Sequence, residues 1–395
     1  MSVPSVQPPR VVPPAAHSTA IAPPSSTCPA HIPDVLVSSC SSCTGWLYEI
    51  GSQIMNFFKN VWAWICGFCC ACSSTSSAAP VALVPSHASH QITNPNKLYV
   101  YHQLTQGRAI SSDPITAQKF ALDPAALENL PLFGHPEPNV SLVNGPFRYD
   151  SSTADTIYWT ANFADSNLFG FCEGPLLAQD ELQVLEHPAL AHLKHALPSD
   201  QRTLNPYEVA LFQNVPRLGA LDTSTPLPNG QTLYGNYFAN ANQAEILSRL
   251  TRFSNPTKSN IFAIAAPHIS SALNGQLYTR RNLELLFFTF HNALKRIKET
   301  CPGKKVVIDM GNWGMGAFGN GGKAVYLALL AAAHFTQADT IRMHPLSRVG
   351  EFHAAKQLLA QIKAGFPQIT VGQFLDHSTQ NAAAYNLRYG LGNGT

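Results

Sequence analysis

A glycine-rich segment of the chain reads Lys305-Val-Val-Ile-Asp-Met-Gly-Asn-Trp-Gly-Met-Gly-Ala-Phe-Gly-Asn-Gly-Gly322. Its first six residues are typical of a buried strand, and the residues after 322 are typical of a helix. Six glycines lie among the twelve residues 311–322. Glycine permits positive φ and close approach of peptide N–H groups, and the start of a helix attracts anions. The segment therefore predicts a diphosphate cradle, with an ordinary glycine-requiring turn as the alternative.

Two standard phosphate-binding motifs fit this segment poorly. The spacing Gly314-x-Gly-x-x-Gly319 matches the dinucleotide fingerprint, and Asp339 follows about 20 residues later. That fingerprint opens its domain, however, whereas this segment lies near the end of the sequence. A P-loop is excluded because Lys323 is followed by Ala324 and not by Ser or Thr. A Rossmann-like, dinucleotide-dependent oxidoreductase therefore stays the weaker alternative.

Strand-like and helix-like stretches alternate on both sides of the glycine-rich segment. The expected strands are 140–143, 156–161, 260–266, 305–310 and 340–343, and the expected helices are 178–196, 281–299, 322–335 and 353–364. This alternation predicts an α/β fold with helices on both faces of a sheet. Residues 345–395 carry no pattern that assigns them a function.

The composition limits the class of partner. Charged residues make up 12% of the chain and the formal net charge is +2. Nucleic-acid-binding proteins usually carry a marked basic excess, so we expect no nucleic-acid partner. Hydrophobic residues make up 45%, which is enough for a substantial core. We expect globular structure over 97–395.

The N-terminal region differs from the rest in composition. Residues 1–45 are rich in proline and predict a disordered tail, with no apolar core of a cleavable signal peptide. Seven of the nine cysteines precede residue 73, a distribution unlike that of a disulfide-stapled secreted domain. Residues 73–96 are rich in Ser, Ala and Pro and predict a linker.

Residues 46–72 have the pattern of an amphipathic helix that continues into a cysteine cluster. The apolar side comprises Leu47, Ile50, Ile54, Phe58, Val61 and Ile65. The uncharged part, 61–72, is shorter than the roughly 20 residues of a bilayer span. An interfacial helix with S-acylation of Cys66, Cys69, Cys70 and Cys72 is the leading interpretation, which predicts a membrane-associated protein whose domain faces the cytosol. The alternatives are a helix docked on the domain, or a zinc site formed by Cys40, Cys43, Cys66 and Cys69.

The segment Gly311-Asn-Trp-Gly-Met-Gly-Ala-Phe-Gly-Asn320 resembles the Gly-x-Trp-Gly-Cys-Gly-x-Phe-Gly-Asn loop of bacterial-type poly(ADP-ribose) glycohydrolases. These are macro-domain enzymes, so the resemblance implies a macro-like three-layer α/β/α domain with a mixed sheet over 97–395. It also implies that the loop wraps the diphosphate of ADP-ribose and that no cofactor is needed. The ligand-binding residues so implied are Gly311, Trp313, Gly314, Gly316, Ala317, Phe318, Gly319 and Asn320, with Phe318 near the distal ribose. Met315 departs from the family's cysteine.

A second part of the resemblance lies upstream. Asn162-Phe-Ala164 and Gln179-Asp-Glu181 stand where the family has Asn-Phe-Ala and Gln-Glu-Glu. By this resemblance Glu181 is the catalytic acid/base, Asp180 holds the distal ribose hydroxyls, and Asn162 and Gln179 belong to the ligand site. Glycoside cleavage needs a carboxyl group that protonates the leaving oxygen and a base that activates water, and neighbouring carboxylates can raise one pKa for that role. The alternative is an ordinary acidic first turn of a helix.

Two departures bear on catalysis. The family's Gly-Gly-Gly before the acidic motif is reduced to Gly170 between Phe169 and Phe171, and the first acid is one methylene shorter. The prediction is an ADP-ribose-binding glycohydrolase acting on poly- or mono-ADP-ribosylated protein; the alternative is a macro-domain reader that binds ADP-ribose without hydrolysis. His192 and His195 have helical spacing but no third ligand, so we expect no metal site. By association, the modular layout suits a bacterial effector secreted into a host cell.

Overall fold

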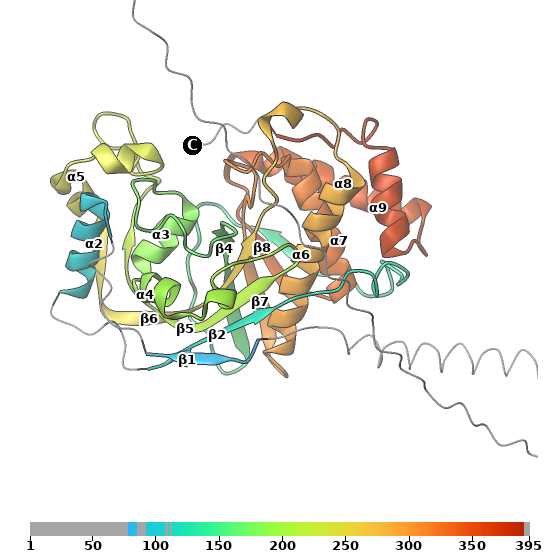
Figure 1. Cartoon of the computed structure of the whole chain (residues 1–395). Helices are drawn as coiled ribbons and strands as arrows, with labels where there is room; N and C mark the ends of the chain where they lie inside the picture. The colour runs from blue at the N-terminus through green and yellow to red at the C-terminus, as the bar shows by residue number, and fades with distance from the viewer. Residues whose placement is uncertain (1–77, 85–91, 107–109, 111–112, 391–395) are drawn as a thin grey trace, which may run out of the picture. The chain divides into compact units, whose positions relative to one another are not determined.

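Eight strands form one sheet in the part of the chain that the computed structural model describes, residues 78–84, 92–106, 110 and 113–390 (Figure 1). Along the sheet the order is β1-β2-β5-β6-β4-β7-β8-β3. The strands are β1 (Val81–Leu83), β2 (Ile115–Phe120), β3 (Asn139–Leu142), β4 (Thr156–Ala164), β5 (Val209–Leu221), β6 (Leu250–Ala265), β7 (Lys305–Met310) and β8 (Thr340–Met343). The expected tail 1–45 and the 46–72 segment lie outside the described residues.

The sheet is mixed, as the resemblance implied. The pairs β6–β4, β4–β7, β7–β8 and β8–β3 are parallel. The pairs β1–β2, β2–β5 and β5–β6 are antiparallel, so β6 joins the two halves of the sheet. Strand β7 is buried along Val306–Met310, which is typical of a parallel strand covered on both faces. Its continuous apolar sequence therefore reflects its position near the middle of the sheet.

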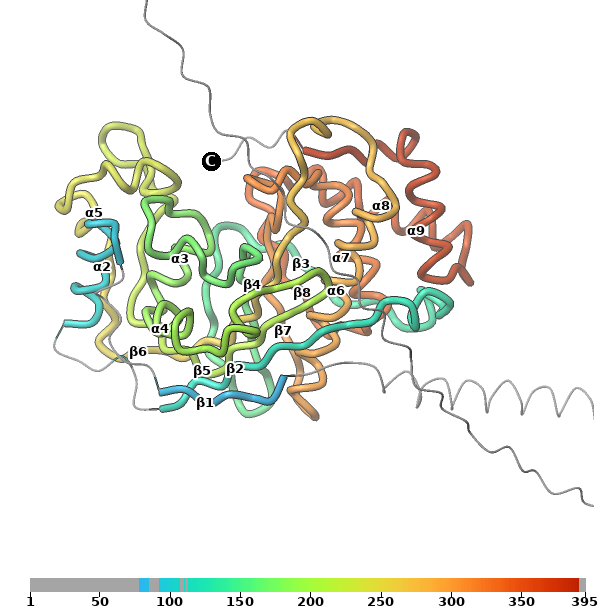
Figure 2. The backbone as a smooth tube through the Cα atoms, in the orientation of Figure 1, coloured from blue at the N-terminus to red at the C-terminus, as the bar shows by residue number. Residues whose placement is uncertain are grey.

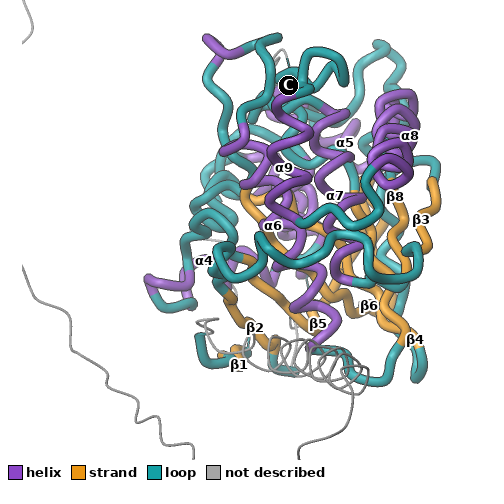
Figure 3. Tube along the Cα trace, turned by 90° about the vertical axis from the view of Figure 1, so that its right-hand side faces the viewer, coloured by secondary structure: helices purple, strands orange, loops and turns teal. Residues whose placement is uncertain are grey.

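Helices cover both faces of the sheet, which confirms the predicted three-layer α/β/α architecture. The long helices on one face are α6 (Arg280–Glu299), α7 (Gly322–Thr336), α8 (Val349–Gly365) and α9 (Val371–Gln380), and Figure 3 looks onto this layer. The other layer holds α2 (Pro95–Thr105), α3 (Gln179–Glu186), α4 (Ala189–Ala196) and α5 (Gln243–Arg249). Separate hydrophobic clusters lie beneath the two layers.

Local sequence signals account for the ends of the long helices. Helix α6 begins at the N-cap Thr279, whose side chain accepts a hydrogen bond from the peptide N–H of Asn282, and basic residues occupy its last turn. The predicted helix 178–196 is instead two helices, α3 and α4. Pro188 separates them, because a proline cannot donate the backbone hydrogen bond that would continue the first helix.

The predicted linker 73–96 contains ordered structure. Val81–Leu83 forms β1, which pairs antiparallel with residues 115–117 of β2 at the edge of the sheet (Figure 2). Helix α2 already begins at Pro95, after the N-cap Asn94. The boundary at 97 is therefore wrong, because a three-residue strand is too short to show a period in the sequence. Among the described residues, no helix is both long and apolar enough to cross a membrane.

Candidate active site

The parallel strands bring four loops together at one edge of the sheet. A cavity of about 1120 Å³ is lined by residues that follow the carboxyl ends of β4, β6, β7 and β8, namely Asp165, His268, His344 and the loop residues 311, 312 and 314–318. Open α/β sheets bind ligands in this position, outside the carboxyl ends of their strands. Ligand pockets commonly measure about 300–1,000 Å³, so this cavity is large enough for a ligand of nucleotide size.

The glycine loop forms one wall of this cavity. Gly314 and Gly319 adopt positive φ values of 70° and 69°, which residues with a side chain rarely adopt. A Cβ on Gly314 would lie 2.7 Å from the Cβ of Ala266, so the loop approaches the end of β6 too closely for any side chain. Of the residues predicted to bind ligand, the loop contributes Gly311, Gly314, Gly316, Ala317 and Phe318 to the cavity wall.

Trp313 and Asn320 support the loop from behind and do not line the cavity. The indole of Trp313 is fully buried, and its Nε1 donates a hydrogen bond of 2.9 Å to the carbonyl of Ile264. The amide of Asn320 donates to the carbonyl of Pro267 at 2.8 Å and accepts from the hydroxyl of Tyr278 at 3.0 Å. These contacts fix the loop to β6 and to the start of α6. Both side chains therefore hold the backbone of the loop in place.

The C-terminal segment packs against the same loop. The peptide N–H of Gly390 donates a hydrogen bond of 2.9 Å to the carbonyl of Gly319. A Cβ on Gly321 would collide with the carbonyl oxygen of Arg388. Residues 388–390 therefore help to hold the end of the loop where α7 begins. Part of the region 345–395, to which the sequence assigned no function, therefore has a structural role.

The acid pair lies at the start of α3 and lines the same cavity. Asp180 and Glu181 are 6% and 3% exposed, so little of either carboxylate meets solvent. Glu181 Oε2 accepts a hydrogen bond of 2.8 Å from the peptide N–H of Ala178 and thereby caps its own helix. The structure thus brings the predicted acids and the glycine loop into one cavity. It also shows the helix-capping contact on which the alternative interpretation of these acids rests.

Asn162 lies beneath the acid pair. It is fully buried on β4, and its Nδ2 donates hydrogen bonds of 2.8 Å to both Asp180 Oδ1 and Gln183 Oε1. Gln179 lines the cavity while its side chain accepts from the peptide N–H of Phe163 at 2.9 Å. In this structure Asn162 therefore orients Asp180 and does not itself line the cavity, and Gln179 ties α3 to β4.

Burial, together with the negative charge of Glu181, raises the pKa of Asp180 to about 7, against the opposing hydrogen bond from Asn162. Burial also raises the pKa of Glu181, against the hydrogen bonds that cap the helix and the charge of Lys97. Protonated and ionised Asp180 are therefore both populated near neutral pH, and the pKa of Glu181 is shifted in the same direction. Such a pair suits general acid–base chemistry at neutral pH.

The cavity wall also contains residues that the sequence did not single out. The guanidinium of Arg217 pairs with Glu186 at 2.7 Å and lies 4.3 Å from the centre of the Tyr149 ring. Burial raises the pKa of Glu186, and Arg217 opposes that shift. Arg217 stands alone among apolar neighbours in β5, and this isolated charge is the only local signal that could have marked it. Arg348, after β8, lies at the glycine-loop end of the cavity.

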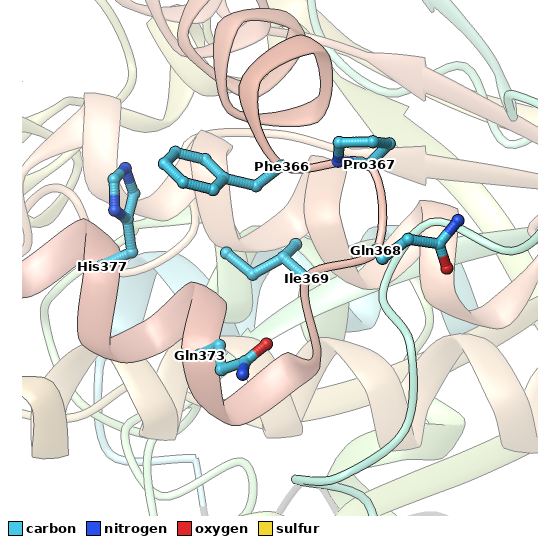
Figure 4. Close-up of a pocket in the computed structure, with 6 residues that line it drawn as sticks. All are labelled: Phe366, Pro367, Gln368, Ile369, Gln373 and His377. Carbon is cyan, nitrogen blue, oxygen red and sulfur yellow. The ribbon is translucent and has the colours of Figure 1, made fainter.

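A second hollow of about 440 Å³ lies where α8 meets α9 and is shown in Figure 4. Its lining residues are Phe366, Pro367, Gln368, Ile369, Gln373 and His377. It contains no carboxylate, and Nε2 of His377 is within 2.7 Å of the hydroxyl of Tyr385. The hollow therefore lacks the paired acids of the large cavity. The candidate active site remains the cavity at the strand ends.

No protein-family model matches the sequence, and no curated protein matches it. Solved structures of bacterial poly(ADP-ribose) glycohydrolases are similar to the chain. The Thermomonospora curvata enzyme is 15% identical, with 66% of this chain and 88% of that chain covered and a TM-score of 0.37. The Deinococcus radiodurans enzyme in complex with ADP-ribose is 13% identical, with 74% and 98% covered and a TM-score of 0.36. Both carry the name of the family that the glycine loop resembles.

Proposed function

We propose that this chain binds ADP-ribose and hydrolyses the ribose O-glycosidic bond that joins ADP-ribose to a protein or to another ADP-ribose unit. One observation carries the proposal: a glycine loop at a helix start and a buried pair of acids line a single cavity of about 1120 Å³. The first feature suits a diphosphate and the second suits cleavage of a glycosidic bond.

The chain supplies each part of the reaction. Peptide N–H groups of the cavity-lining loop residues Gly314, Gly316, Ala317 and Phe318 hold the diphosphate, which places the distal ribose toward α3. Protonated Glu181 donates its proton to the leaving oxygen as the bond from that oxygen to the ribose C1″ breaks. Ionised Glu181 then takes a proton from a water molecule that adds to C1″, which restores the acid. Asp180, oriented by Asn162, accepts hydrogen bonds from the ribose hydroxyls.

The test is calorimetric titration of ADP-ribose into the full-length chain, followed by a release assay on ADP-ribosylated protein. Glu181→Gln keeps the shape of the side chain but removes the transferable proton. We expect ADP-ribose binding within about threefold of wild type and a loss of turnover of about 10²–10⁴-fold, the usual contribution of a general acid. An equally active Glu181→Gln chain would refute the mechanism, and no ADP-ribose binding by wild type would refute the function.

The second candidate function is that of a reader, which binds ADP-ribose without hydrolysing it, and two features of the site favour it. Phe171 lines the cavity where the resembled family has glycine, and its side chain is 55% exposed. Glu181 already accepts a hydrogen bond that caps its helix. If wild type binds ADP-ribose and releases none from any ADP-ribosylated protein or polymer tested, the chain is a reader.

We further propose that 46–72 attaches the protein to a membrane through its apolar side and S-acylated Cys66, Cys69, Cys70 and Cys72, with the domain facing the cytosol. The sequence pattern supports this proposal, and the segment lies outside the described residues. A role as a bacterial effector in a host cell follows only by association with this layout. Fractionation of cells that express residues 40–75 fused to a reporter tests the attachment. A wholly soluble fusion would exclude it.

A further inference from the structure

Lys97 is a charged side chain with no part in the mechanism above, and it is fully buried in the first turn of α2. Its Nζ donates a hydrogen bond of 3.3 Å to the carbonyl of Phe171, in the turn that follows β4. The side chain of Phe171 lines the cavity. Burial of an ammonium group is costly unless opposite charge lies close by. The neighbours of Lys97 must therefore supply that charge.

Helix α2 packs against α3, and the charges of four ionisable groups of α3 and of the turn after β4 act on Lys97. They are Glu181, Asp180, Cys172 and Glu173. Glu173 is already paired with Lys194 at 3.0 Å and with His195 at 2.7 Å. Burial raises the pKa of the Cys172 thiol to about 12, so this group is neutral at physiological pH. The acid pair therefore remains as the main source of compensating negative charge.

The interaction is reciprocal. Burial lowers the pKa of Lys97 to about 8, and among the opposing causes the charge of Glu181 is the largest. Lys97 in turn lowers the pKa of both acids, against their burial and the nearby charge of Asp165. Tyr234 also lies near Glu181, but burial raises the pKa of its hydroxyl, so it stays neutral. The two acids and Lys97 thus form one buried charge cluster.

We infer that Lys97 is a positioning residue for the acid pair: its ammonium group stabilises a negative charge shared by Asp180 and Glu181 and anchors the Phe171 carbonyl beside them. Lys97 does not line the cavity and need not touch a substrate. The consequence for catalysis rests on the proposed hydrolase function, whereas the charge coupling does not. Two experiments test the effect on catalysis and the charge coupling separately.

The first experiment compares pH profiles of kcat/KM for the full-length chain and for Lys97→Met, which keeps the side-chain length and removes the charge. Loss of a nearby cation raises the pKa of both acids, so the whole profile should move to higher pH by about one unit. Lys119→Met is the matched control: Lys119 is mostly buried, donates to the carbonyl of Thr203 and pairs with Glu208. We expect its profile to stay in place. A lower rate in Lys97→Met without any movement of the profile would overturn the inference.

The second experiment needs no catalysis and no Lys97 variant that retains activity. The full-length chain is labelled with ¹³Cε-lysine, and the Lys97 resonance is assigned by its absence in Lys97→Arg or Lys97→Met. We expect this resonance to titrate near pH 8 in wild type, as its environment indicates, and at lower pH in Glu181→Gln, which removes compensating charge. Titration near the ordinary value of about 10.4, unchanged in Glu181→Gln, would overturn the coupling. If coupling is present but wild type shows no turnover, the proposed hydrolase function fails and the charge cluster stands.

Discussion

Single residues in the cavity differ in what they can tolerate, and the two glycines at 314 and 316 show this most directly. Gly314 has φ of 70° and no room for a Cβ, whereas nothing lies within 4 Å of a Cβ placed on Gly316. Positive φ in a residue with a side chain costs about 1–2 kcal/mol, and the close contact with the Cβ of Ala266 adds to that cost. Only the first of these glycines is therefore required by the fold.

Gly314→Ala should lower the free energy of unfolding by about 2–4 kcal/mol. Gly316→Ala is the matched control and should change it by less than about 1 kcal/mol. Urea denaturation of both variants, followed by circular dichroism, measures the difference. Equal losses would mean that the loop relaxes to accept a side chain at 314.

The raised pKa of Asp180 makes the folded protein less stable at alkaline pH. Its pKa is raised to about 7 in the folded protein, against about 3.9 in an unfolded chain, so the folded state binds its proton more tightly. The stabilisation that this proton supplies is complete below pH 4 and is lost as the pH rises through 7. A site built for catalysis commonly carries such a cost.

Asp180→Asn removes this ionisation and should raise the free energy of unfolding by about 2 kcal/mol at pH 8, with little change at pH 4. Chemical denaturation at the two pH values provides the measurement. A gain of equal size at both would point to a cause other than the buried charge.

At the scale of elements, the glycine loop is supported by a segment far away in the sequence. Residues 388–390 contact Gly319 and Gly321 at the point where α7 begins. Tyr389 is buried, and its ring lies 4.3 Å from that of Tyr278, whose hydroxyl holds Asn320. The C-terminal segment and α6 therefore support the loop together.

A chain that ends after Leu387 should bind ADP-ribose at least about tenfold more weakly, equal to about 1.4 kcal/mol, because the loop loses part of its support. The matched control ends after Gly390, keeps these contacts and should bind as the full chain does. Isothermal calorimetry compares the two, with circular dichroism to verify the fold. Equal affinities would show that α6 and Asn320 hold the loop without help.

At the scale of the whole molecule, the ordered domain begins earlier than the sequence indicated. Strand β1 covers the edge of β2 through the pairs Val81–Ala117 and Leu83–Ile115. An uncovered strand edge leaves backbone groups unpaired and favours association between chains. Residues 78–84 and 92–96 therefore belong with the domain.

A chain that begins at residue 97 should melt several degrees lower than one that begins at residue 78, because it lacks both β1 and the N-cap of α2. It should also show more association in light scattering as the edge of β2 becomes free. Differential scanning calorimetry at matched concentration makes the comparison. Equal melting temperatures would mean that β1 contributes no stability.

The sequence by itself determined the parts of this protein that depend on adjacent residues. The bounds of β7 and β8 were predicted to the residue, and α7 to within one, because a buried run, a glycine turn and a helix follow one another directly. The strands β1 and β5 were missed, and β6, which pairs antiparallel with β5, was predicted only from residue 260 onward. Much of β6 before Asn260 is exposed, so its pattern lacks an apolar period.

Only the tertiary structure decided what each site residue contacts. The motif placed Asn162, Trp313 and Asn320 in the ligand site, but in the structure none of the three lines the cavity, and their side chains bond Asp180, Ile264 and Pro267 instead. Lys97 bonds the carbonyl of Phe171 from 74 residues away in the sequence, and Gly390 bonds Gly319 from about 70 residues away. Such contacts arise from strand order and helix packing, which no local pattern encodes. The chemistry of the site could therefore be predicted from adjacent residues, whereas its support and its charge balance required the fold.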